Sequence, residues 1–242
     1  MAMNVAVVRL LGSAVLFVSS LAQAHYLWLE SGKETVKLFY GEVEEGVREK
    51  SPGKLDAIRS PQASIVTGDA AALTPSVVRM ADHFAISLPR SASAVVVRDE
   101  AAEVRDLSAY NLGVAKTNYY ARLQQASLAS RSEGPSLPLD IAPQGKNQFI
   151  VLYNGKPLSK AKLQVIAPNT WVQEHTTDRE GKVAINTPWR GRYVLHVLHV
   201  DPAPGEFEGK PYQFLRNHFT YSFVESKGNP AGPALPPQSR PD

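Results

Sequence analysis

Residues 149–155 read Phe-Ile-Val-Leu-Tyr-Asn-Gly, and this stretch indicates a β fold. Its first five residues are apolar or aromatic and suit a buried strand. The pair Asn154-Gly155 is typical of a tight turn between two strands. Similar short runs recur further along the chain with turn residues between them, which favours an antiparallel sandwich. We expect these strands at residues 161–166, 171–176, 182–186, 192–200 and 218–224.

The first half of the chain has the same character. Residues 35–40 alternate roughly between polar and apolar side chains, as a half-buried strand does. Residues 42–61 are charged and contain Pro52-Gly53, so we expect a long loop with one short helical turn. Further strands are expected at residues 26–29, 64–67, 76–80, 83–88, 94–98 and 118–123.

These patterns predict an all-β protein with two Ig-like antiparallel β-sandwich modules after a signal peptide. Ser, Pro and Gly between residues 127 and 140 suggest a linker. The final stretch is rich in Pro, Gly and charged residues, a composition typical of disorder. The expected parts are a signal peptide at 1–24, an N-terminal β domain at 25–130, a C-terminal Ig-like sandwich at 141–226 and a disordered tail at 227–242.

The signal peptide is predicted from the order of charge, apolar residues and small residues at the start. Arg9 precedes an apolar run over residues 10–18, and Ala22-Gln23-Ala24 gives the small-x-small cleavage pattern. The apolar run is shorter than the roughly 20 residues that a membrane-spanning helix needs. We therefore expect export, cleavage after Ala24 and a mature chain without an integral membrane segment.

Composition excludes several classes of function. The chain has 242 residues, a formal net charge of +3 and no cysteine. Without cysteine there can be no disulfide, no thiol nucleophile and no thiolate metal ligand, so a metal site would need His, carboxylate, Met or backbone donors. The basic residues are scattered, which argues against nucleic-acid binding. Common nucleophile, phosphate-loop and dinucleotide motifs are absent from the sequence, and we expect no enzymatic activity.

His25 is the first candidate for a binding role. After cleavage at Ala24 its α-amino group and its imidazole would belong to one terminal residue, and together they could chelate a single metal ion. The α-amino group has an ordinary pKa near 7.7–8.0, so a metal ion displaces its proton readily. A second imidazole would complete a histidine brace, and nitrogen-rich sites favour Cu(II) or Ni(II). The alternative is that cleavage merely leaves a histidine at this position.

His199 and His218 are the candidates for that second imidazole. His199 lies near the end of a predicted strand, and His218 begins the last one. His196 is three residues before His199, so the two side chains point to opposite faces of a strand. We expect His196 to pack in the sheet, whereas His199 and His218 are either metal ligands or ordinary surface residues.

The remaining polar candidates carry less information. His83 follows Asp82 at a predicted turn, and His175 lies within a predicted strand. Both residues, and Asp201 as well, could approach the site or simply face solvent. We interpret the acidic residues of the predicted loops as solvated charge; they are Glu42, Glu44, Glu45, Glu206 and Glu208.

Several segments together resemble the DUF4198 family of bacterial periplasmic proteins, a group described as NikM-like or associated with nickel and cobalt transport. Residues 25–28 resemble the start of the family's proteins, and residues 39–42 resemble the family's "GE" segment. Its Ig-like half resembles the turns at 154–158 and 177–181. Its C-terminal block resembles Gly191-Arg192-Tyr193, His199-Val200-Asp201, residues 205–212 and residues 218–223.

This resemblance implies a periplasmic protein of β-sandwich modules that binds a transition metal. It adds weight to His25, His199 and His218 as one shared metal site. Our first hypothesis is therefore binding of Ni, Co or Cu for uptake or delivery, with a membrane metal transporter as partner. The alternatives are a structural or interaction module that needs no metal, and a histidine-brace copper oxidase.

Overall fold

The computed structural model confirms the all-β class. It describes residues 25–32, 35–67, 72–89, 92–125, 135–233 and 235–239. The expected signal peptide at 1–24 and most of the expected linker lie outside these residues. Within the described chain the only helical elements are two short 3-10 turns, η1 (Lys54–Ala57) and η2 (Ser108–Tyr110). No described helix has the length and apolar character needed to cross a membrane.

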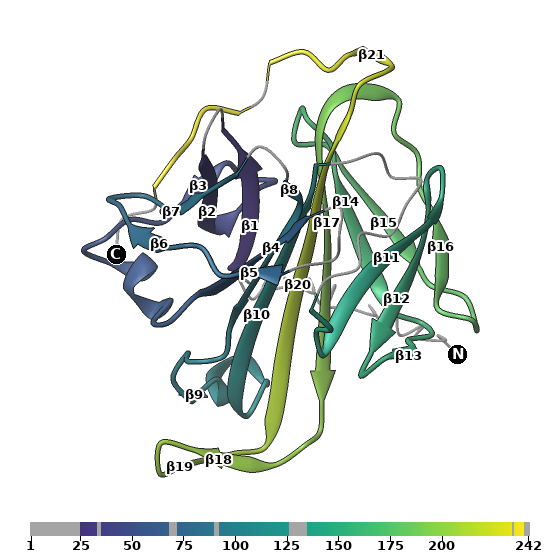
Figure 1. Cartoon of the computed structure of the whole chain (residues 1–242). Coiled ribbons are helices and arrows are strands. Elements are labelled where there is room, and N and C mark those ends of the chain that lie inside the picture. The colour runs from purple at the N-terminus through teal and green to yellow at the C-terminus, as the bar shows by residue number, and fades with distance from the viewer. Residues whose placement is uncertain are drawn as a thin grey trace, which may run out of the picture.

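A ten-stranded sheet forms the middle of the molecule (Figure 1). The order along its main path is β15-β14-β17-β20-β10-β8-β4-β5, with β9 beside β10 and β21 beside β17. The bounds are β4 (Gln62–Thr67), β5 (Ala72–Leu73), β8 (Ala92–Asp99), β9 (Arg105–Asp106), β10 (Val114–Gln124), β14 (Lys162–Ile166), β15 (Val172–Thr176), β17 (Trp189–Asp201), β20 (Phe214–Glu225) and β21 (Asn229–Pro230).

Two smaller sheets cover its opposite faces (Figure 1). The N-terminal outer sheet has the order β1-β2-β7-β6, with β3 on β2; its strands are β1 (Tyr26–Ser31), β2 (Thr35–Glu42), β3 (Val47–Arg48), β6 (Val77–Arg79) and β7 (Phe84–Ser87). The C-terminal outer sheet comprises β11 (Leu139–Gly145), β12 (Gln148–Tyr153), β13 (Lys156–Pro157) and β16 (Lys182–Ala184). A separate hairpin joins β18 (Gly205–Phe207) to β19 (Lys210–Tyr212).

The central sheet crosses the boundary that the sequence suggested between two modules. β10 from the first half runs parallel to β20 from the second half, with a register from Ala115↔Phe214 to Leu123↔Ser222. Pairings between other neighbours in this sheet are antiparallel, apart from the short β21 edge. The two halves therefore share one sheet, and each supplies an outer layer of its own.

Alternation of side chains along the central strands buries apolar residues on both faces of the sheet. On β20, Phe219 and Tyr221 pack with Phe149 beneath the C-terminal outer sheet. Thr220 points the other way, and its Oγ1 donates a hydrogen bond of 2.7 Å to the carbonyl of Leu27 on β1. His218 has the same parity as Thr220, so it faces the N-terminal outer sheet.

The C-terminal tail differs from the disordered segment that its composition suggested. Asn229 and Pro230 pair with Trp189 and Arg190. Further on, the amide of Gln238 donates to the carbonyl of Gly46, and its carbonyl accepts from the amide of Arg48, both at 2.8 Å. Figure 1 shows this segment in yellow, extended across the upper end of the molecule toward the N-terminal outer sheet. Proline-rich chain is readily extended, and main-chain hydrogen bonds to an exposed edge hold it in place.

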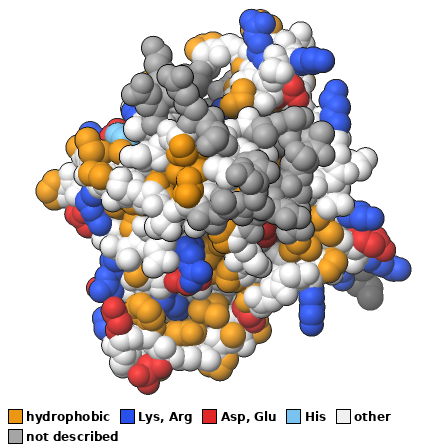
Figure 2. Space-filling view, in the orientation of Figure 1, with side chains coloured by type: hydrophobic (Ala, Val, Ile, Leu, Met, Phe, Trp, Pro, Cys, Tyr) orange, Lys and Arg blue, Asp and Glu red, His pale blue; other side chains and the backbone are white. Residues whose placement is uncertain are grey.

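Charged side chains of both signs are distributed over the face seen in Figure 2. In Figure 2, Lys and Arg side chains are interspersed with Asp and Glu side chains and do not gather in one basic patch.

Candidate functional site

His25 directly precedes β1 and lies against the end of β2. The first pair of that ladder is Tyr26↔Gly41, and β2 then pairs with the short strand β3 through Gly41↔Arg48 and Glu42↔Val47. A side chain at residue 41 is sterically excluded, because a Cβ there would lie 2.2 Å from the carbonyl oxygen of Val47. The glycine allows β3 to approach closely, and this places Glu42 and Glu49 beside His25.

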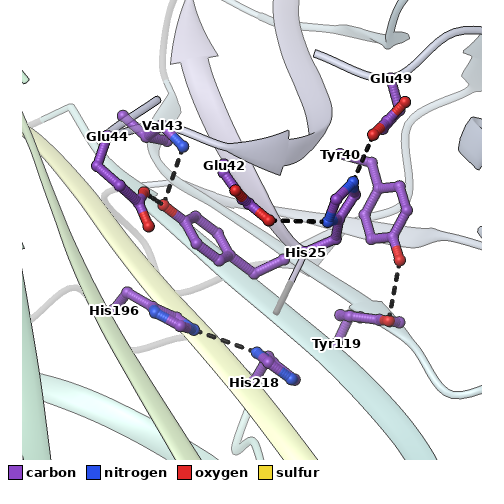
Figure 3. Close-up of polar contacts among 10 residues, drawn as sticks. His25, Tyr40, Glu42, Val43, Glu44, Glu49, Tyr119, His196 and His218 are labelled. Atoms are coloured by element: carbon purple, nitrogen blue, oxygen red, sulfur yellow. Dashed lines mark hydrogen bonds and ion pairs between the residues drawn. The ribbon is translucent and has the colours of Figure 1, made fainter. Parts of the chain in front are cut away.

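Two buried carboxylates contact opposite nitrogens of the His25 ring (Figure 3). Nδ1 lies 3.0 Å from Oε1 of Glu42, and Nε2 contacts Oε1 of Glu49. The side chains are 12%, 6% and 3% exposed for His25, Glu42 and Glu49. The ring of Tyr40 lies alongside, with its centroid 5.3 Å from that of His25.

The electrostatics favour a protonated His25 in the metal-free chain. Burial lowers the pKa of this imidazole, but the hydrogen bonds and negative charges of Glu42 and Glu49 outweigh burial and raise it. Buried carboxylates need a compensating charge nearby, and the imidazolium supplies it. This compact acid–histidine–acid arrangement is hereafter called the His25 site.

Tyr26 connects the His25 site to a second group of polar side chains. Its hydroxyl donates to the carboxylate of Glu44 and accepts a 3.0 Å hydrogen bond from the amide of Val43. Its ring stacks on that of His196, with centroids 4.1 Å apart.

His196 and His218 form a buried pair (Figure 3). Nε2 of His196 lies 3.2 Å from Nδ1 of His218, and the rings are nearly parallel at 10°. Tyr119 stacks on His218, and its hydroxyl lies 3.2 Å from that of Tyr40 beside His25. Burial lowers the pKa of His196 to about 3, and burial, reinforced by nearby positive charge, lowers that of His218 well below its ordinary value. Both imidazoles are therefore neutral.

The expectation that His25, His199 and His218 share one site does not match this geometry. His218 is opposite Leu198 in the β17–β20 ladder, so it shares a face with His196 and not with His199. The His199 ring instead packs on Tyr153 of the C-terminal outer sheet, 4.2 Å between centroids. His218 is also buried, so the alternative of an ordinary surface histidine is wrong for it.

The other candidate residues have partners elsewhere. Nδ1 of His83 contacts Asp82 at 2.6 Å, and His175 lies 3.3 Å from Gln173. Asp201 accepts a 2.6 Å hydrogen bond from the hydroxyl of Tyr153.

Two residues of the His25 site were not recognised in the sequence. Glu42 was read as solvated loop charge, but it ends β2 and is 4% exposed, and Glu49 was not singled out. The available signal for Glu42 was its position two residues after the expected strand 35–40, which extends as β2 to Glu42. Sequence spacing alone gave no comparable signal for Glu49.

The described side chains alone do not form a metal site at His25. Among the described residues no group of three or more His, Asp and Glu side chains is arranged to hold a metal ion. The reason at His25 is geometric, because Glu42 and Glu49 approach opposite ring nitrogens and cannot meet at one ion. His25 Nδ1 and Oε1 of Glu42 lie on the same side, and these two atoms are the donors that the described side chains place together here.

Comparison with known proteins gives one match. A family model described as a domain of unknown function, DUF4198, matches residues 136–201. No curated protein and no solved structure matches the chain. The matched segment runs from the start of the C-terminal outer sheet to the end of β17. Over residues 136–201 this match supports the resemblance to the DUF4198 family seen in the sequence, and it assigns no function to the chain.

Proposed function

We propose that the exported protein, cleaved after Ala24, binds a divalent Ni, Co or Cu ion at the His25 site and serves metal uptake or delivery in the periplasm. The α-amino group and Nδ1 of His25 would be two donors and Glu42 a third. When bound, the ion is cargo to be passed on, with a membrane metal transporter as the expected partner. The role in transport rests on the family resemblance, whereas the choice of donors rests on geometry.

The observation that carries the proposal is the 3.0 Å approach of Glu42 Oε1 to Nδ1 of His25. Nδ1 is the ring nitrogen closest to the backbone, so it is the one that forms a chelate with the α-amino group of the same residue. A bound cation would replace a proton on this nitrogen. A set of nitrogen and carboxylate donors without thiolate suits the middle and late first-row divalent ions.

Glu49 supports the proposal from the opposite edge of the ring. Metal-ligating histidines almost always donate their second N–H to a carboxylate or carbonyl, which fixes the tautomer and the ring orientation. Glu49 contacts Nε2 and is 3% exposed. It would therefore hold His25 with Nδ1 directed toward Glu42 and the amine.

A structural role for the same residues is the second candidate. One observation favours it: both ring nitrogens of His25 already have buried carboxylate partners without any metal. In that case the His25 site would anchor the start of β1 onto β2, and the protein would act through its surfaces alone.

Metal analysis of protein exported with its own leader distinguishes the two candidates. Mass spectrometry first establishes that the chain begins at His25, and titration calorimetry with Ni²⁺, Co²⁺ and Cu²⁺ then measures binding. The matched control is the same mature chain with its α-amino group acetylated, which removes this donor but retains Glu42 and Glu49. We expect one ion per chain, and weaker binding by about tenfold or more in the acetylated form. Equal binding by both forms, or none by either, would contradict the proposal.

A further inference from the structure

A groove with an uncharged lining lies at one end of the C-terminal half. It has a volume of about 510 Å³, within the range usual for small-molecule sites. It lies between the β11–β12 turn, the start of β15 and the β16–β17 connection. Its lining combines two tryptophans with side chains that carry an amide or a hydroxyl, namely Trp171, Trp189, Asn147, Gln173, Asn186 and Thr187.

The two tryptophans form a rigid aromatic corner. Their rings are 5.4 Å apart and nearly perpendicular at 85°. Trp171 is 52% exposed, although a side chain of this size is usually well covered. Trp171 immediately precedes β15 and Trp189 begins β17, so both positions are fixed by the central sheet. The corner therefore offers a flat apolar surface to solvent at little cost in conformational entropy.

The polar side chains around this corner are partly fixed and partly free. Thr187 Oγ1 donates to Oδ1 of Asn147 at 3.2 Å, and Nε2 of Gln173 donates to the carbonyl of Asn186 at 3.0 Å. Within the described chain, the Nδ2 group of Asn147 and the whole side-chain amide of Asn186 make no hydrogen bond. Asn186 is exposed. The groove thus presents free donors and an acceptor beside an aromatic face.

We propose that this groove binds a neutral carbohydrate. A sugar ring has one face of C–H groups, which packs on an indole, and a rim of hydroxyls that both donate and accept, as carboxamides do. The lining has no charged residue to pair with an ionic ligand. A proline-rich peptide could also stack on tryptophan, but its backbone offers acceptors without matching donors, so it would leave the acceptor of Asn186 unused.

This inference goes beyond the proposed metal-binding function and does not depend on it. The groove uses none of the residues around His25, and neutral sugar hydroxyls need no metal to bind there. A failure of either proposal leaves the other unaffected.

Tryptophan fluorescence of the mature full-length chain tests the proposal. The chain has three tryptophans, and the third, Trp28, is buried and stacked on Phe39, so its signal should not change. The probes are hexasaccharides of α-1,4-linked glucose, β-1,4-linked glucose and β-1,4-linked N-acetylglucosamine. We expect saturable binding of at least one, with a dissociation constant on the order of 1 mM or tighter, as suits a shallow site with few polar contacts.

Variants test whether the sugar binds in this groove, and a peptide probe tests whether the ligand is a carbohydrate. Binding measured by NMR of the sugar should weaken about tenfold or more in Trp171→Ala and Asn186→Ala. The matched control is Tyr110→Ala, which removes an aromatic side chain that is 62% exposed and lies outside the groove. No binding of any hexasaccharide, equal binding by Trp171→Ala and wild type, or saturable binding of a proline-rich decapeptide in place of the sugars would overturn the proposal.

Discussion

Nε2 of His196 lies 3.2 Å from Nδ1 of His218 in the buried space between the central sheet and β1. At this distance one nitrogen donates and the other accepts, so the contact is satisfied when both rings are neutral. Tyr26 covers one ring and Tyr119 the other. A second proton on either ring would place a positive charge beside the neighbouring imidazole. At His218 this charge would also be repelled by the positive charges of Arg216 and His25.

This pair should make the protein sensitive to mild acid. In the unfolded chain both histidines titrate near the ordinary pKa of 6.5, whereas in the fold burial holds their pKa values lower. Below pH 6.5 the unfolded state therefore binds more protons, and the free energy of unfolding falls as the pH falls. For two histidines the expected loss is on the order of 3 kcal/mol between pH 6.5 and 5. Urea denaturation over this range measures it.

The double variant His196→Gln/His218→Asn is the comparison for that measurement. It retains polar side chains but has nothing to protonate in this pH range. Its stability should be lower at pH 7 and should depend less on pH below 6.5. If wild type and variant lose stability in parallel, the pair does not titrate as we expect. His25 acts in the opposite sense, since its raised pKa contributes stability that is complete below pH 6.5 and is lost as the pH rises through its folded value.

Sequence reasoning succeeded where a local pattern carries the information. Strand 35–40 is found within β2, and the acid-rich loop contains the expected helical turn as η1. The expected strand at residues 118–123 is part of β10. These features depend on alternation and turn residues, which are visible within a few positions of the chain.

It failed where the outcome depends on which strands become neighbours. The parallel pairing of β10 with β20 joins residues about a hundred positions apart, and no local pattern indicates it. Because of that pairing and the packing of β1, both faces of β17 and β20 are covered. Histidines pointing to either face therefore occur within apolar stretches of sequence. The sequence correctly put His196 and His199 on opposite faces, but it could not tell which face His218 would share.

Glu49 and Glu42 should affect metal binding differently, since only Glu42 is proposed as a direct donor. Replacing the orienting carboxylate in Glu49→Gln should weaken binding by about 10–100-fold, the usual effect of such partners. It should also lower the pKa of His25 in the metal-free protein, which NMR titration of the ring measures. The control is Glu44→Gln, which changes a nearby carboxylate that contacts Tyr26 and not His25. An unchanged affinity and an unchanged His25 pKa in Glu49→Gln would contradict the role of Glu49.

The ion pair between Arg122 and Asp140 should be important for stability. Nη2 of Arg122 on β10 lies 3.1 Å from Oδ2 of Asp140 on β11, and the side chains are only 6% and 7% exposed. Arg122→Ala removes the ion-pair partner of a buried carboxylate, so it should lower the free energy of unfolding by about 3–5 kcal/mol. Arg98→Ala is the matched control, because the Arg98 side chain is 49% exposed in its pair with Glu100 and should contribute about 1 kcal/mol or less. Urea denaturation measures both variants. An equal decrease in the free energy of unfolding would show that the buried pair contributes no more than the exposed pair.

The C-terminal tail should stabilise the loop that carries Glu49. Gln238 exchanges main-chain hydrogen bonds with Gly46 and Arg48 on either side of β3, and Glu49 follows directly. Gly46 has a φ of 68°, and a Cβ there would lie 3.0 Å from the carbonyl of Pro236, so the tail lies close against this turn. Deleting residues 235–242 removes two hydrogen bonds, which contribute about 0.5–1.5 kcal/mol each.

We therefore expect the amide of Arg48 to exchange its hydrogen faster in the truncated protein, by about tenfold for each 1.4 kcal/mol of local stability lost. Hydrogen-exchange mass spectrometry of a peptide spanning β3 measures this, and metal titration of the same protein should show weaker binding, since Glu49 would hold His25 less firmly. A deletion of residues 240–242 alone retains Gln238 and is the control. If Arg48 exchanges equally slowly without Gln238, the β2–β3 hairpin is stable by itself, and the tail does not contribute to the His25 site.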